Sequence, residues 1–327
     1  MKKLFSIECK GAILSPFLWI AACIPIGLNL YGIVLTSYGF TITASSFFFD
    51  NTPVICIFLS IFIPLHIGQE FEVRTINNKI MAGYSRSQIY LTEMLISILC
   101  GFLLLVTDIG SILLLAKITA LSFGITFHEF FMECILCFVC VAVISALFTM
   151  ITMLMHKRLS SIAVALCLTI LGLQLGGNTV SDLKQEEYRV EKDGTTTENV
   201  LYIKGLERTL ANGHMLISPF AQAKYQPEMQ HETADMKAEN SLIFKNVSHH
   251  WEFLMMNLIE IIVFTRLGLL LFKKQDLIAK KSRQFFKAVC YTLEVIYFFF
   301  LILSFSNSIV AAPATRNIEI TITVPLI

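Results

Sequence analysis

The chain has 327 residues, of which 55% are hydrophobic and 15% are charged, and its formal net charge is +1. Soluble globular domains carry about 25% charged residues, so this composition excludes an ordinary soluble domain, and the balanced charge argues against a nucleic-acid partner. We therefore expect a multi-pass protein embedded in a lipid bilayer.

The first predicted element is a short helix over residues 1–10, where Lys2, Lys3 and Lys10 flank apolar residues, as in helices that lie at a membrane interface. Apolar stretches long enough to cross a bilayer follow. Four contain no charged residue and lie within 10–50, 50–70, 133–156 and 158–182. Three more, at 94–117, 251–272 and 287–310, are as apolar but carry an acidic residue inside, namely Asp108, Glu260 and Glu294. The sequence thus predicts seven spans.

Lysine and arginine predict the orientation of these spans. With the N-terminus inside, the inner loops at 66–93, 156–158 and 273–287 are rich in basic residues, whereas the short outer loops hold only Lys117. This asymmetry is typical of the positive-inside rule. We expect a cytoplasmic N-terminus in a cell membrane of bacterial type.

A polar segment over 182–249 separates the fifth and sixth spans, and it is too long for a bare loop. Residues 188–203 predict two strands around the Asp193–Gly194 turn. Residues 206–213 predict a short helix stopped by Asn212 and Gly213. We expect a small α+β domain outside the membrane.

Residues 68–90, GQEFEVRTINNKIMAGYSRSQIY, form a polar stretch between the second and third spans. Acids, bases, amides and single apolar residues alternate there, which suits a helix that contacts a protein better than one immersed in lipid. Apolar side chains would enter a groove of the partner, and polar ones would set the register. The groove residues are Phe71, Ile76, Ile80 and Met81, the register residues are Glu70, Glu72 and Arg74, and Gly83 and Ser85 would end this helix and cap the next.

This stretch resembles the permease subunits of ABC-2 type transporters. The residues that match the motif of that family are Glu70, Phe71, Thr75, Ile76, Gly83, Ser85, Arg86 and Tyr90. Arg74 departs from it, because the family commonly has glycine before the threonine. The segments LFKKQDL (271–277) and ISPFAQA (217–223) also resemble the family, and the likeness covers roughly 1–278.

The resemblance implies an all-α integral membrane protein with a six-helix bundle, to which a seventh helix is added here. Residues near 69–83 would be a coupling helix that docks on a separate ATPase subunit. That subunit would bind ATP and magnesium, and the permease would work as a homodimer or with a second permease. The implied regions are 1–181 for the first five spans, 182–249 for the outer domain, 250–278 for span six, and 279–327 for the added loop, span and tail.

No nucleotide-binding loop is present in the sequence, so we expect no enzyme activity and no cofactor in this chain. His128 and Glu129 begin like a zinc-protease motif, but Met132 stands where the second histidine would be. Cys134, Cys137 and Cys140 fan out around a helix and do not converge on an ion. We therefore predict packing roles and no metal site for these residues.

Charged residues inside apolar spans are costly and suggest a site facing the bundle interior. Asp108, Glu260 and Glu294 are such residues, and they could line a substrate path or form interhelical hydrogen bonds; Glu260 could also pair with Arg266. Gly172 and Gly176 allow close helix approach, either within one chain or in a dimer.

The leading hypothesis is an ABC-2 type exporter subunit. Two rival hypotheses remain: a membrane-anchored sensor or immunity protein that binds a peptide through its outer domain, and a secondary transporter driven by ions through Asp108 and Glu260. The sequence does not name a substrate.

Overall fold

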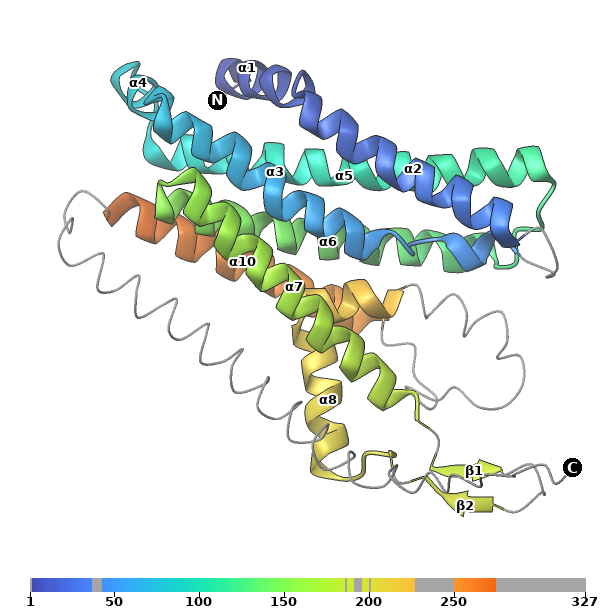
Figure 1. Cartoon of the computed structure of the whole chain (residues 1–327). Coiled ribbons are helices and arrows are strands. Elements are labelled where there is room, and N and C mark those ends of the chain that lie inside the picture. The colour runs from blue at the N-terminus through green and yellow to red at the C-terminus, as the bar shows by residue number, and fades with distance from the viewer. Residues whose placement is uncertain are drawn as a thin grey trace, which may run out of the picture.

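The computed structural model of the chain describes residues 2–36, 43–185, 187–190, 196–199, 201–226 and 250–274. Within these residues six helices are long and apolar enough to cross a membrane, as predicted for spans one to six (Figure 1). The predicted seventh span, the tail and Glu294 lie outside the described residues. The six helices are α2 (Pro16–Thr36), α3 (Thr52–Glu72), α5 (Arg86–Thr119), α6 (Phe127–Met155), α7 (Arg158–Leu183) and α10 (His250–Lys274).

Helix α5 begins earlier than the predicted span at 94–117. Ser85 accepts a hydrogen bond from the Gln88 amide, and the Gln88 side chain accepts one from the Ser85 amide. This capping box satisfies two amides at the helix start, so the predicted Ser85 cap is confirmed. The polar turn and the apolar span therefore form one helix of 34 residues, about 51 Å long.

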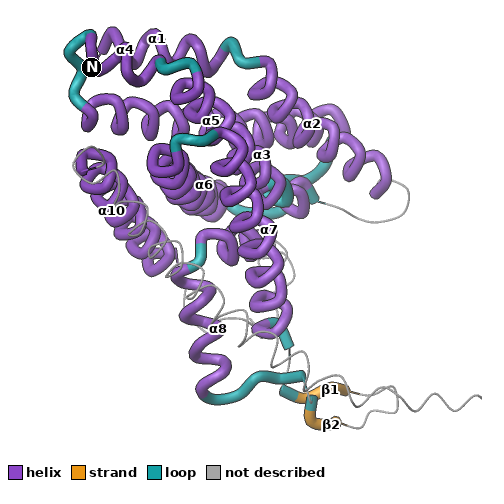
Figure 2. The backbone as a smooth tube through the Cα atoms, turned by 60° about the vertical axis from the view of Figure 1, so that its left-hand side comes forward, coloured by secondary structure: helices purple, strands orange, loops and turns teal. Residues whose placement is uncertain are grey.

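Helix α6 lies at the centre of the bundle and is the most buried of the six (Figure 2). It packs against α3, α5, α7 and α10, while α2 packs on α5 and α3. Serine and threonine hydroxyls on α6 donate to carbonyls one turn earlier in the same helix, as at Ser145 and Thr152. These bonds satisfy polar groups that are cut off from water.

One end of the bundle gathers the loops that the charge count assigns to the inner side. The Phe71 ring contacts the His156 ring with centroids 4.4 Å apart, and Gly68 packs directly against Arg158. Helix α1 (Lys2–Ile13) and helix α4 (Thr75–Met81) lie at this same end (Figure 1). We call it the α4 end; its cytoplasmic location stays a prediction.

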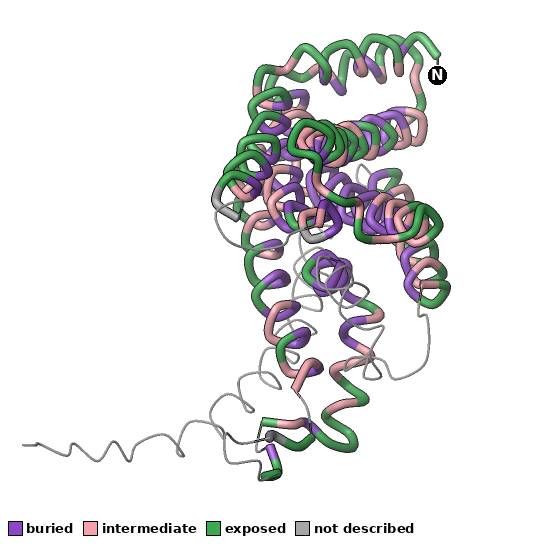
Figure 3. The backbone as a smooth tube through the Cα atoms, turned by 90° about the vertical axis from the view of Figure 1, so that its right-hand side faces the viewer, coloured by how far each residue is buried: buried purple, intermediate pink, exposed green. Residues whose placement is uncertain are grey.

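The opposite end holds a 3₁₀ turn, η1 (Ala44–Phe47), and the described part of the polar segment between α7 and α10. Strands β1 (Tyr188–Val190) and β2 (Thr196–Glu198) pair in antiparallel register, which confirms the predicted hairpin. Helix α8 (Leu206–Ile217) does not stop at Asn212 and Gly213, so that predicted boundary is wrong. His214 and Met215 are buried beyond it, and their packing outweighs the local stop signal. Figure 3 shows the buried residues of the described chain gathered mainly where the helices pack together.

The described part of the outer segment shares its apolar contacts with the membrane helices. Met215 and Ile203 belong to one buried cluster with Leu136 of α6, Val180 of α7 and Phe253 of α10. The hydroxyl of Thr179 on α7 also lies 2.9 Å from Nδ1 of His214. This segment is therefore fixed on the ends of three spans.

Candidate functional site

Helix α4 is a separate short helix because the backbone turns sharply on both sides of it. Arg74, just before it, has φ +58°, in the left-handed region where a side chain costs about 1–2 kcal/mol. Gly83, just after it, has φ +91°, which confirms the predicted stop. Arg74 thus takes the left-handed conformation that glycine adopts easily. The sharp turn forms here although arginine stands where the ABC-2 motif commonly has glycine.

The two faces of α4 differ in exposure. Ile76 and Lys79 are buried at 3% and 6% exposure and point toward the bundle. The opposite side is exposed, and Met81 on it is 78% exposed. We call this side the α4 outer face; it consists of Val73, Arg74, Asn77, Asn78, Met81 and Ala82.

Several predicted coupling residues lie behind this face. Glu70 is 8% exposed and contacts Lys79, rather than lying at an outer rim as expected. Ile76 belongs to the apolar core, and the half-buried Phe71 packs on it. Thr75 is half-buried, and Gly83 is exposed. A role of these residues in coupling stays a prediction, but Glu70 and Ile76 can serve it only by holding α4 in place.

Arg86 and Tyr90, which also match the motif, face α10. The Arg86 guanidinium donates to the carbonyl of Phe272 at 3.2 Å and lies 5.6 Å from its ring centroid. Tyr90 donates its hydroxyl to the carbonyl of Phe264, and its ring packs against Gly268 with no room for a side chain. These contacts fix the α4 end of α5 to the last turns of α10.

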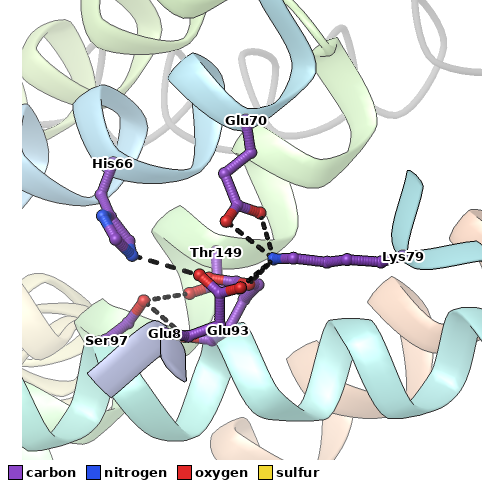
Figure 4. A network of polar contacts seen from close by, with 7 residues as sticks. All are labelled: Glu8, His66, Glu70, Lys79, Glu93, Ser97 and Thr149. Carbon is purple, nitrogen blue, oxygen red and sulfur yellow. Dashed lines mark hydrogen bonds and ion pairs between the residues drawn. The ribbon is translucent and has the colours of Figure 1, made fainter. Parts of the chain in front are cut away.

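Lys79 is the centre of a buried ion-pair network beneath α4 (Figure 4). Its Nζ lies 2.7 Å from both carboxylate oxygens of Glu70, 2.8 Å from Oε1 of Glu8 and 2.9 Å from Oε1 of Glu93. The three acids come from α3, α1 and α5. One ammonium group therefore connects four helices.

The network shifts the proton equilibria of its members outside the spans. Burial works to lower the pKa of Lys79, but the charges of Glu93 and Glu70 and hydrogen bonds with Glu70 and Glu8 outweigh it, so the pKa is raised. Burial likewise works to raise the pKa of Glu8, but hydrogen bonds to Glu70 and Lys79 and the charge of Lys79 lower it. Both groups stay charged at neutral pH.

Sequence reasoning did not find this network. The network joins Lys79 to Glu8 and Glu93, which lie on separate helices far apart in the chain. No regular spacing in the sequence indicates that they meet. A sequence signal did exist at Glu93, because an N-cap at Ser85 places it two turns inside the following helix.

Asp108 of α5 forms a second buried polar cluster, nearer the other end of the bundle. One carboxylate oxygen, Oδ1, accepts hydrogen bonds at 2.9 Å from the side-chain amides of Asn29 and Asn51. The other oxygen, Oδ2, is buried without a hydrogen-bond partner. The prediction that Asp108 faces the bundle interior is confirmed. Asn29 lies within an apolar run and Asn51 just before one, and no local pattern in the sequence connects either of them with Asp108.

Glu260 and Arg266 lie apart on α10. Glu260 is half-buried, with Oε2 lacking a hydrogen-bond partner, and Arg266 is exposed. Six residues of helix turn the side-chain direction to about 120° short of two full turns, so the two side chains point in different directions. The sequence alternative of a local pair between them is not supported.

The candidate packing residues contact neighbours within the chain. A Cβ on Gly172 would lie 2.5 Å from Cδ2 of Phe220, and one on Gly176 would lie 2.6 Å from Cα of Ala221. Both neighbours belong to the helical stretch at 219–226. The two glycines therefore serve in-chain packing.

The remaining candidates for metal binding are accounted for by local contacts. Glu129 completes the capping box of Thr126 at the start of α6, and His128 is exposed. Cys137 lies 3.4 Å from the Thr52 hydroxyl, and Cys140 donates to the carbonyl of Pro219 at 3.1 Å. The cysteines pack between helices, as predicted.

Compared with models of protein families, with curated proteins and with solved structures, the chain matches none. The geometry of the described residues and the motif near α4 are therefore the basis for assigning a function.

Proposed function

We propose that the chain is the membrane permease subunit of an ABC-2 type transporter, which exports its substrate and is driven by a separate ATPase subunit. The observation that carries the proposal is α4. It is a short helix set between two spans at one end of the bundle, with its inner face anchored by Lys79 and its outer face exposed.

This arrangement suits the transfer of motion from a partner. The α4 outer face presents Met81 and Asn77 for contact, while Lys79 connects α4 to α1, α3 and α5. Movement of a docked ATPase would thus reach three helices through one buried ion pair. The left-handed backbone at Arg74, where the family commonly has glycine, also supports the resemblance.

The experiment compares Met81→Arg with the matched variant Leu206→Arg in tagged protein purified from native cells in mild detergent. Both side chains are largely exposed, at 78% and 74%, but they lie on opposite ends of the molecule. We expect wild type and Leu206→Arg to retain an ATPase partner and ATP hydrolysis, and Met81→Arg to lose both. A chain that purifies alone without ATPase activity in several detergents, or a fully active Met81→Arg, would contradict the proposal.

A second candidate function is ion-coupled transport, favoured by the buried Asp108 with its unpartnered oxygen. Asp108→Asn separates the two candidates. In vesicles without added ATP, a wild-type ion-coupled carrier would transport its substrate and Asp108→Asn would not. An ABC-2 permease would show no transport in these vesicles, with or without the substitution.

A further inference from the structure

Three side chains from three helices meet beside Lys79. Glu8 of α1, His66 of α3 and Glu93 of α5 each place one donor atom within 4.8 Å of the other two. Carboxylate oxygens and an imidazole nitrogen are common ligands of metal ions in proteins. Only the folded bundle brings these three residues together.

Two of these donor atoms are buried and have no hydrogen-bond partner: Nε2 of His66 and Oε2 of Glu93. The Glu93 side chain has no exposed surface, and its Oε2 points at Nε2 of His66 across 3.9 Å (Figure 4). That distance is too long for a hydrogen bond. Two metal–ligand bonds of about 2.1 Å span up to about 4.2 Å, so an ion fits between the two atoms.

The charge of the site also favours a cation. Glu8, Glu70 and Glu93 surround the single ammonium group of Lys79. Because a hydrogen bond joins Glu8 to Glu70, one of these two carboxyl groups holds a proton, which leaves one negative charge in excess beside a neutral His66. Uncompensated charge in a buried site is costly. A bound cation would compensate this excess.

We propose that Glu8, His66 and Glu93 bind a divalent transition-metal ion, Zn²⁺ or Mn²⁺. The imidazole favours these ions over Ca²⁺ and Mg²⁺, and the two carboxylates suit both. Lys79 holds Oε1 of Glu93 and thereby leaves Oε2 directed at the ion. The ion would tie α1 to α3 and α5, directly beneath α4.

The test is calorimetric titration of the purified full chain, stripped with a chelator, with Zn²⁺ and Mn²⁺, and with Ca²⁺ and Mg²⁺ for comparison. We expect one Zn²⁺ or Mn²⁺ ion per chain and a higher unfolding temperature in its presence. Ca²⁺ and Mg²⁺ should bind far more weakly.

The variants are His66→Gln and Glu8→Gln, with His128→Gln as the matched control for an exposed histidine. Each of the first two should weaken binding by more than about 100-fold, while His128→Gln should bind like wild type. Gel filtration identifies any variant that fails to fold. If one of the two site variants fails, the binding measured with the other one tests the site. Equal binding by wild type and His66→Gln, or loss of binding in His128→Gln, would overturn the site.

The site goes beyond the proposed transport function and does not depend on it. The titration uses the isolated chain, with no ATPase and no ATP. Failure of metal binding would leave the permease proposal standing, and loss of the ATPase partner would leave the metal site standing.

Discussion

At the scale of single residues, Lys79 has the largest structural role among the polar side chains beneath α4. It is 6% exposed and contacts Glu8, Glu70 and Glu93 at 2.7–2.9 Å. Removing one partner of a buried ion pair leaves the other charge without compensation, which costs more than the pair contributes. Glu70 thus affects α4 through Lys79.

Lys79→Met should therefore destabilise the protein by about 3–5 kcal/mol. The measurement is thermal unfolding in detergent, with Lys10→Met as control, because Lys10 is exposed on α1. Lys79→Arg keeps the charge and should lose less. An unfolding temperature of Lys79→Met equal to that of Lys10→Met would show that the network does not stabilise the fold.

At the scale of elements, the contact between α7 and the stretch at 219–226 depends on glycine. Gly176 allows Ala221 to approach so closely that a Cβ would lie 2.6 Å from its Cα. Its neighbour Gly177 faces open space, with nothing within 4 Å of a Cβ. Two adjacent glycines of one helix thus differ only in their surroundings.

Gly176→Ala should destabilise the protein by about 1–3 kcal/mol, because the added methyl group overpacks this contact. Gly177→Ala is the matched control and should be neutral or slightly stabilising, because alanine favours the helix. Thermal unfolding and gel filtration of both variants are the measurements. A loss of dimer with unchanged stability in Gly176→Ala would instead assign the glycine to an interface between chains.

At the scale of the whole molecule, the described elements divide between two ends of the bundle. Helices α1 and α4 lie at one end, and η1, the hairpin and α8 lie at the other (Figure 1). If one of the helices between these elements did not cross the bundle, elements of the two groups would lie at the same end. The arrangement agrees with the alternation of inner and outer loops that the basic residues predict.

Cysteines placed at the two ends should respond differently to a membrane-impermeant maleimide added to intact cells. Thr197→Cys, on the exposed strand β2, should be labelled directly, and Asn78→Cys, on the α4 outer face, only after permeabilisation. The chain without an added cysteine is the control for its native thiols. The reverse labelling pattern would invert the orientation.

The membrane class, the existence of six spans, the hairpin at 188–198 and the end of α4 at Gly83 could all be predicted from the sequence. These features are local: apolar runs of bilayer length, a turn at Asp193–Gly194, and caps at Gly83 and Ser85. Each can be predicted because the residues that cause it are neighbours in the chain. The start of α4 could not be predicted: the expected helix near 69–83 is divided, because residues up to Glu72 belong to α3 and α4 begins at Thr75. The helix stop at Asn212 failed because the burial of His214 and Met215 comes from other helices.

The direction in which the polar side chains point follows from contacts in the folded bundle. Glu70 was expected at an outer surface and lies inside, because Lys79 and two further acids from α1 and α5 surround it there. Likewise, the asparagines around Asp108 are separated from it by 79 and 57 residues. Pairing of buried charges depends on contacts between distant segments, and no local pattern in the sequence records those contacts.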